Sequence, residues 1–223
     1  MQINILDSFL DKYIDGYLLS DIKTIKDKIP RDNHPGNASY LMTSALCSGI
    51  EFLGFLLRQP QEGQEVNGSF AFEHYCKNYL KNIDSRYEAF GIIGRELIRN
   101  GIAHSFVTKG KVGITRRGDR DDTHLVRYAD KKLVIINPDF LYEDFKKSYL
   151  EYAKPRLAET GDLRNRAETN YQRLKDKYNE EIDRIEQATK NKLDDWPWLY
   201  KDLVANEITM EIVEENGTEP MVS

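Results

Sequence analysis

A nearly unbroken apolar stretch at residues 40–57, YLMTSALCSGIEFLGFLL, constrains the fold of this chain more than any other feature. A helix formed by such a stretch is apolar on every side, whereas a surface helix carries one apolar stripe. We therefore expect residues 38–58 to form the buried central helix of a bundle. No apolar run approaches the ~20 residues that span a bilayer, and the N-terminus lacks a basic leader. We expect a soluble, cytoplasmic protein that contacts no membrane.

The neighbouring segments also predict helices. Residues 3–29 place apolar side chains at helical spacing, and residues 69–83 form a third helical segment. Ser85 and Glu88 have the spacing of a capping box, which predicts that a fourth helix begins at Arg86. Four helices joined by short or medium loops make a bundle.

The texture of the sequence changes after the fourth helix. Residues 111–137 contain short β-branched runs separated by turn residues, which predicts a small antiparallel β-hairpin or meander. Asn137, followed by proline and aspartate, marks the start of a helix that runs to about Lys154. From Asp162 a long charged helix carries a thin apolar seam with an eleven-residue repeat. The seam fits a helix packed along its own bundle, or an arm that docks on a second subunit.

The chain is therefore predicted to be mostly α, a four-to-five-helix bundle with an inserted β-hairpin and a long C-terminal helix. We assign residues 1–160 to the helical domain, 161–205 to a C-terminal helical arm and 206–223 to a loose acidic tail. The only two cysteines, Cys47 and Cys76, fall inside apolar helical patterns. Buried, reduced thiols of a cytoplasmic protein are the better interpretation of this pattern.

A basic block interrupts an acidic chain. The formal net charge is −5, yet residues 108–132 carry 8 Lys and Arg against 4 Asp and Glu. Such a block attracts polyanions, and its cations contact backbone phosphate without reading sequence. The alternative is a solvated β-ribbon with no ligand. The candidate RNA contacts are Lys109, Lys111, Arg116, Arg117, Arg120 and Arg127.

The segment RELIRNGIAHSF, residues 95–106, ends the fourth predicted helix and precedes the basic block. Within it, Arg99 is followed directly by Asn100 and then by His104. A second arginine–histidine pair, Arg117 and His124, lies in a predicted turn and lacks this context. The motif and its place in the chain resemble the signature helix of the HEPN superfamily (higher eukaryotes and prokaryotes nucleotide-binding), over roughly residues 1–107.

The resemblance implies a metal-independent endoribonuclease without a cofactor, whose site is completed in a homodimer, acting as a toxin or antiviral-defence effector. It implies that Arg99 holds the scissile phosphate, that His104 moves protons, and that Asn100 orients one of them. Glu51 could support the site, and Arg95 is expected to pair with a carboxylate such as Glu51. Partners would be RNA and an antitoxin or defence-system protein. The alternative is a catalytically inactive HEPN-like module that binds a nucleotide or a protein.

The residue types suit this chemistry independently of the resemblance. RNA carries its own nucleophile, so cleavage needs only proton transfer and charge stabilisation, which imidazole and guanidinium groups supply. The four histidines are scattered, so no metal site is expected.

The helical spacing of the motif raises a difficulty. On a regular helix Arg99 and His104 lie ~140° apart around the axis and ~7.5 Å along it. Either the helix loosens near Gly101, or the arginine reaches round, or a second subunit completes the pair. Gly91, Gly94 and Gly101 would permit close backbone approach, though packing within the chain also explains them. A surface arginine and a helix-end histidine are the alternative to a site.

Overall fold

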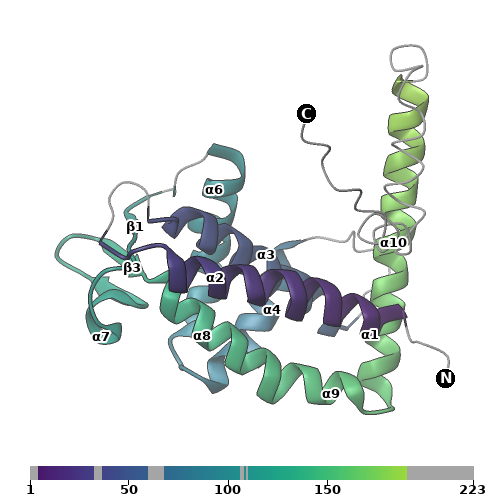
Figure 1. Ribbon diagram of the computed structural model, residues 1–223, viewed down its shortest axis with the longest axis horizontal. Helices are drawn as coiled ribbons and strands as arrows, with labels where there is room; N and C mark the ends of the chain where they lie inside the picture. The colour runs from purple at the N-terminus through teal and green to yellow at the C-terminus, as the bar shows by residue number, and fades with distance from the viewer. Residues whose placement is uncertain (1–4, 33–36, 60–67, 106–107, 109, 190–223) are drawn as a thin grey trace, which may run out of the picture. The chain divides into compact units, whose positions relative to one another are not determined.

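Helix α3 (Ser39–Leu57) forms the centre of the first of two compact units, residues 1–170 and 171–223. The structure is a computed structural model, and it describes residues 5–32, 37–59, 68–105, 108 and 110–189 (Figure 1). Met42, Leu46, Ile50 and Leu53 of α3 have no exposed surface. The central helix predicted at 38–58 is therefore confirmed.

By length and composition alone, α3 is apolar enough to cross a membrane, which corrects the expectation that no run approaches that length. In the structure, 61% of its most apolar window is buried inside the protein. This burial is the pattern of a core helix in a bundle.

Three helical segments within residues 5–105 pack around α3. The first segment is continuous and bears out the helix predicted over 3–29 for the residues that are described: α1 (Ile5–Phe9), the π-helix η1 (Leu10–Leu19) and α2 (Ser20–Lys28). The second comprises α4 (Gly68–Asn78) and the 3₁₀ turn η2 (Leu80–Asn82). The third comprises α5 (Tyr87–Ile93), the π-helix η3 (Gly94–Arg99) and α6 (Asn100–Ser105).

Two features explain how these helices pack and begin. A Cβ atom on Gly54 would lie 1.9 Å from the carbonyl oxygen of Ala71, so only glycine lets α3 approach α4 this closely. The fourth helix has Arg86 as its N-cap residue, close to the predicted start, but no side chain caps it. The predicted capping box is therefore wrong, and Asp84 Oδ1 instead accepts a hydrogen bond from the Arg86 N–H at 3.0 Å.

The inserted sheet differs from its prediction. It has three strands in the order β1-β3-β2, with β1 parallel to β3 and β2 antiparallel to β3. The strands are β1 (Val112–Ile114), β2 (Val126–Tyr128) and β3 (Leu133–Ile136). An all-antiparallel hairpin is wrong because the chain between β1 and β2 buries Arg116 and forms α7 (Arg120–Thr123) before it returns to the sheet.

The segment after the sheet returns along the N-terminal helix (Figure 1). Asn137 caps its first helix by accepting from the Asp139 N–H at 3.0 Å, which confirms the predicted start. The Tyr149 hydroxyl donates to Asp15 at 3.0 Å, and Lys154 pairs with the same carboxylate at 2.9 Å. The elements are α8 (Pro138–Ser148), the π-helix η4 (Tyr149–Ala153) and α9 (Lys154–Ala158).

Helix α10 (Asp162–Thr189) begins in the first unit and includes the residues of the second unit up to Thr189. In the first unit, Asn170 Nδ2 donates to the carbonyls of Phe55, Leu56 and Arg58 at 3.0 Å each. These bonds satisfy carbonyls that the end of α3 would otherwise leave without partners.

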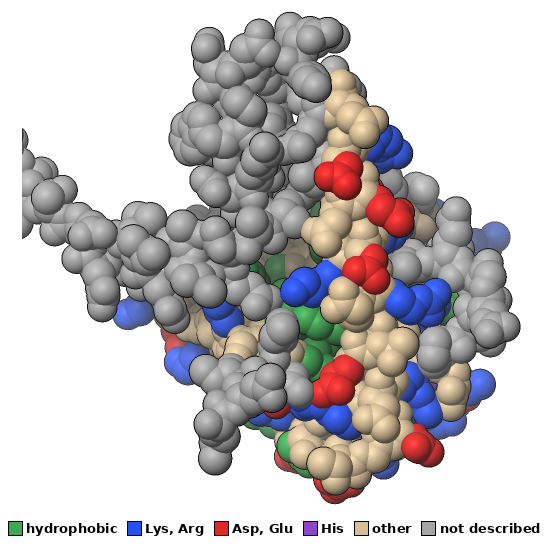
Figure 2. Space-filling model, turned by 90° about the vertical axis from the view of Figure 1, so that its right-hand side faces the viewer, with side chains coloured by type: hydrophobic (Ala, Val, Ile, Leu, Met, Phe, Trp, Pro, Cys, Tyr) green, Lys and Arg blue, Asp and Glu red, His purple; other side chains and the backbone are tan. Residues whose placement is uncertain are grey.

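In the second unit, pairs such as Lys177 and Glu181, 4.0 Å apart, support the exposed faces of α10. Acidic and basic side chains are interspersed along this helix, as Figure 2 shows for one face. Whether its seam serves its own bundle or a second subunit stays a prediction. The acidic tail predicted at 206–223, and the arm beyond residue 189, lie outside the described residues.

Candidate functional site

Arg99 contacts two other residues of the predicted site, Glu51 and Asn100, and the three come from different helices. Arg99, the last residue of η3, lies with its Nε 2.6 Å from Glu51 Oε2 of α3. A second guanidinium nitrogen donates to Glu51 Oε1 at 3.2 Å, and the third donates to Asn100 Oδ1 at 3.1 Å. The Arg99 side chain keeps 33% of its surface exposed, so a ligand in solvent can reach it. We call Glu51, Arg99 and Asn100 the arginine cluster.

A buried cysteine, Cys47, lies beside the arginine cluster on α3. Cys47 lies one turn before Glu51 on α3 and has no exposed surface. Burial, with a smaller contribution from the Glu51 carboxylate, raises the pKa of the Cys47 thiol to about 12. The thiol is therefore protonated at neutral pH and supplies no nucleophile. Any chemistry at this position therefore depends on the residues of the arginine cluster and not on Cys47.

The helix that carries Arg99 is irregular just before the arginine. The Asn100 N–H donates to the Arg95 carbonyl five residues back, which closes a π-helical turn over Gly94–Arg99. Such turns often occur at functional positions. The expectation of loosening near Gly101 is wrong, because the helix is α-helical again from Asn100 to Ser105. His104 lies in α6, and its side chain is outside the part of the chain that the structure describes.

Two of the glycines in this helix serve packing within the chain. A Cβ atom on Gly91 would lie 3.3 Å from Glu73 Cα of α4 and 3.2 Å from Cys76 Cβ. A Cβ atom on Gly94 would meet the Phe90 and Phe72 rings at 3.0 Å or less. The packing explanation is therefore supported for both positions.

Arg95 does pair with carboxylates, but the expected partner Glu51 is wrong. Its guanidinium lies 3.1 Å from Glu96 and 3.4 Å from Glu73 of α4. Glu51 is already engaged by Arg99, which follows Arg95 by one turn of η3. Arg95 therefore ties η3 to α4, while Arg99 ties it to α3.

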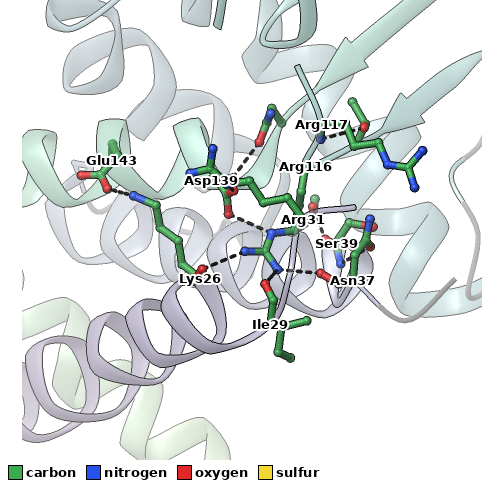
Figure 3. Close-up of polar contacts among 12 residues, drawn as sticks. Lys26, Ile29, Arg31, Asn37, Ser39, Arg116, Arg117, Asp139 and Glu143 are labelled. Carbon is green, nitrogen blue, oxygen red and sulfur yellow. Dashed lines mark hydrogen bonds and ion pairs between the residues drawn. The ribbon is translucent and has the colours of Figure 1, made fainter. Parts of the chain in front are cut away.

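The prediction that Arg116 contacts RNA is wrong, because its side chain has no exposed surface. Its Nε lies 2.9 Å from Asp139 Oδ1 (Figure 3). The remaining guanidinium nitrogens donate to backbone carbonyls at 2.8–3.1 Å, those of Lys26, Ile29 and Asn37. Arg116 thus joins the sheet insertion to the end of α2 and the start of α3, and it cannot meet a nucleic acid.

The other basic residues of the insertion divide into engaged and exposed side chains. Arg120 is partly buried and pairs with Asp144 of α8, so it is poorly placed to hold RNA. Arg117 is exposed and donates to the Asp32 carbonyl at 2.6 Å. Lys111 and Arg127 are exposed, and Lys109 lies outside the described residues. For these exposed side chains RNA contact stays a prediction.

Sequence reasoning missed a buried polar network around His124. The Tyr87 hydroxyl lies 2.9 Å from His124 Nε2 and donates to Asp144 Oδ2 at 2.8 Å. Burial lowers the pKa of His124 and raises that of Tyr87. Burial alone would raise the pKa of Asp144, but hydrogen bonds from His124, Arg120 and Tyr87 outweigh it and lower the pKa.

This network joins α5, the insertion and α8, and its members Tyr87 and Asp144 are 57 residues apart in the sequence. The one local signal is Asp144, which falls on the same face of α8 as the buried Leu141 and Phe145. His124 and Asp144 are both buried, so the network serves stability.

Elsewhere, the first unit has an apolar groove of about 490 Å³ between the η1–α2 helix and α3. In this groove the Phe9 ring stacks on Tyr13, with centroids 4.5 Å apart, and lies tilted against Phe52, with centroids 5.2 Å apart. Its lining supplies Asp21 as the one titratable acid, and no cation. Phosphate chemistry therefore does not fit this groove. Within the described residues, no group of three His, Cys, Asp or Glu side chains is placed to hold a metal ion.

No family model, no curated protein and no solved structure matches this chain. The HEPN resemblance therefore rests on the residues of the motif and their position alone. It stays a prediction.

Proposed function

We propose that this protein is a metal-independent endoribonuclease of HEPN type, with Arg99, Asn100 and His104 as its catalytic residues. The arginine cluster is the observation that carries the proposal. Arg99 and Asn100 contact each other, and Glu51 fixes the guanidinium from a second helix. Three of the five guanidinium N–H groups hold Arg99 in a fixed orientation, and the two that remain, on Nη1 and Nη2, can donate to phosphate oxygens.

In this proposal the 2′-OH of the RNA attacks the adjacent phosphorus atom while the bond from phosphorus to O5′ breaks. The His104 imidazole accepts the 2′-OH proton, and a protonated acid returns a proton to O5′. Arg99 stabilises the charge that develops on the non-bridging oxygens. The products are a 2′,3′-cyclic phosphate and a 5′-hydroxyl end, so the reaction balances without another reactant.

The attacking and leaving oxygens lie on opposite sides of the phosphorus, so the base and the acid must face each other across it. One α6 helix presents a single histidine, and α-helical spacing turns it ~140° away from Arg99. We therefore propose a homodimer in which a second copy supplies the opposing histidine across a two-fold axis. A toxin or antiviral-defence setting, with an antitoxin or defence-system protein as partner, is part of the same proposal.

The second candidate function is a catalytically inactive HEPN-like module that binds a nucleotide or a protein. One observation favours it, since Glu51 already neutralises the charge of Arg99. A structural ion pair between two helices would have the same geometry. The two candidates differ in what the loss of His104 would do.

The test is RNA cleavage in the presence of EDTA by the wild type, Arg99→Ala and His104→Ala. Arg86→Ala is the matched control, because the Arg86 side chain is also part-exposed, at 41%, and also pairs with a carboxylate, that of Asp84. We expect each site variant to lose at least about 100-fold in rate and the control to keep its rate. Activity that survives both site substitutions contradicts the proposal. An inactive wild type that still binds nucleotide or protein favours the second candidate.

A further inference from the structure

A second pocket lies on the flank of α4, beside the end of α3. Its volume is about 620 Å³, and both polar and apolar atoms line it. Small-molecule sites span roughly 300–1,000 Å³, so the pocket can hold a ligand the size of a nucleotide. We call it the α4 pocket, and it is lined by Arg58, Phe70, Glu73, His74, Lys77 and Asn78.

The charges around the α4 pocket favour an anion. Lys77 is exposed on its rim, and Arg58 lies in its wall against the Phe55 ring, 5.2 Å from the ring centroid. Arg166 reaches the carbonyl of Leu57 at 3.5 Å, at the turn that leads into Arg58. Among the described residues of the lining, Glu73 is the one acid, and it pairs with Arg95 outside the pocket.

The protonation state of His74 also reflects positive charge near the pocket. Asn78 Nδ2 lies 3.2 Å from His74 Nδ1, and since an amide nitrogen only donates, Nδ1 accepts and the imidazole is neutral. Burial, followed by the charges of Arg166 and Arg58, lowers the pKa of His74. The charge of Arg58 in the wall, and that of Arg166 behind it, therefore both act on the pocket.

An aromatic side chain stands at the rim. Phe70 keeps 56% of its surface exposed although it lies on a helix with a buried face. Its neighbour Ala71 and the next ring, Phe72, have no exposed surface. Proteins that bind single-stranded nucleic acids combine an exposed aromatic ring with nearby cations, so that a base stacks on the ring and the phosphate lies against the cations.

We propose that the α4 pocket binds a nucleotide unit, with its phosphate against Arg58 and Lys77 and its base against Phe70. The unit is either a free nucleotide or part of an RNA strand. The Glu73–Arg95 ion pair joins α4, which lines the pocket, to η3, which carries Arg99. The RNA form of this inference rests on the proposed ribonuclease function, whereas the free-nucleotide form does not.

The test uses the full chain carrying Arg99→Ala, so that no probe is cleaved. Fluorescence anisotropy measures binding of a 5′-fluorescein-labelled oligouridine of eight nucleotides, and UMP competes for it. The pocket variants are Phe70→Ala and Lys77→Glu. Their controls are Ile92→Ala, an equally exposed apolar residue at 59%, and Lys147→Glu, which makes the same charge change on α8. Melting curves check that each variant folds.

We expect each pocket variant to weaken binding about tenfold, in line with the usual effect of one stacked base, and each control to stay within twofold. If the variants weaken UMP and the oligonucleotide alike, the ligand is a free nucleotide. If they weaken only the oligonucleotide, it is an RNA strand. Absence of binding by either probe, or pocket variants that behave like their controls, overturns the inference. Absence of RNA cleavage by the wild type would contradict the proposed function. Binding of UMP at the α4 pocket would not be affected by that outcome.

Discussion

Replacing Arg116 by alanine should destabilise the protein without any direct effect on RNA. The substitution removes four hydrogen bonds at 2.8–3.1 Å from a side chain with no exposed surface. Breaking a buried ion pair from one side costs about 3–5 kcal/mol. Asp139 keeps Arg31 as a partner at 2.9 Å, so we expect the lower end of that range. The melting temperature should fall by roughly 6–12 °C, given about 2–4 °C per kcal/mol for a chain of this size.

Urea denaturation measures this loss as a lower midpoint with an unchanged slope. The matched control is Arg117→Ala, the exposed neighbour, which should stay within about 0.5 kcal/mol of the wild type. Arg116→Lys should recover only part of the loss, because an ammonium group cannot reach four acceptors as a planar fork does. The reasoning fails if Arg116→Ala leaves the midpoint unchanged and instead lowers RNA affinity, as an exposed phosphate contact would.

Three further predictions concern the core and the candidate site. Because the folded pKa of His124 lies below its usual 6.5, the unfolded chain binds the proton first, so wild-type stability should fall from pH 7 to pH 5. His124→Gln should flatten that part of a melting-temperature profile. Gly54→Ala should destabilise by about 3 kcal/mol or prevent folding in a urea titration, since the new methyl group would overlap the Ala71 carbonyl. Glu51→Gln should cost no more than about 1 kcal/mol, and it should lower the rate of RNA cleavage by less than Arg99→Ala does.

The helices of the first unit could be predicted because their signals are local. The apolar stretch of α3 defines a buried helix whatever surrounds it, and Asn137 caps α8 through an atom two residues away. Glu51 is the one acid in the apolar stretch of residues 40–57, which is visible in the sequence. Its engagement by a basic residue follows from the cost of leaving a half-buried carboxylate alone.

The errors arose where distant residues decide the outcome. Arg116 looked like one more cation of a basic block, but its backbone acceptors lie 79 to 90 residues earlier in the chain. The choice between Arg95 and Arg99 as the partner of Glu51 depends on the π-helical turn of η3, which changes the direction of every side chain after it. Counting charges or spacing residues on a regular helix cannot reveal either effect.

The chemical identity of the ends of cleaved RNA tests the central claim most directly. Wild-type protein is incubated in EDTA with a 3′-labelled and a 5′-labelled RNA, and the termini are resolved by mass spectrometry. We predict 2′,3′-cyclic phosphate and 5′-hydroxyl ends that disappear in Arg99→Ala and His104→Ala. Ends with a 3′-hydroxyl and a 5′-phosphate, or cyclic phosphate formed equally by the variants, would contradict the account.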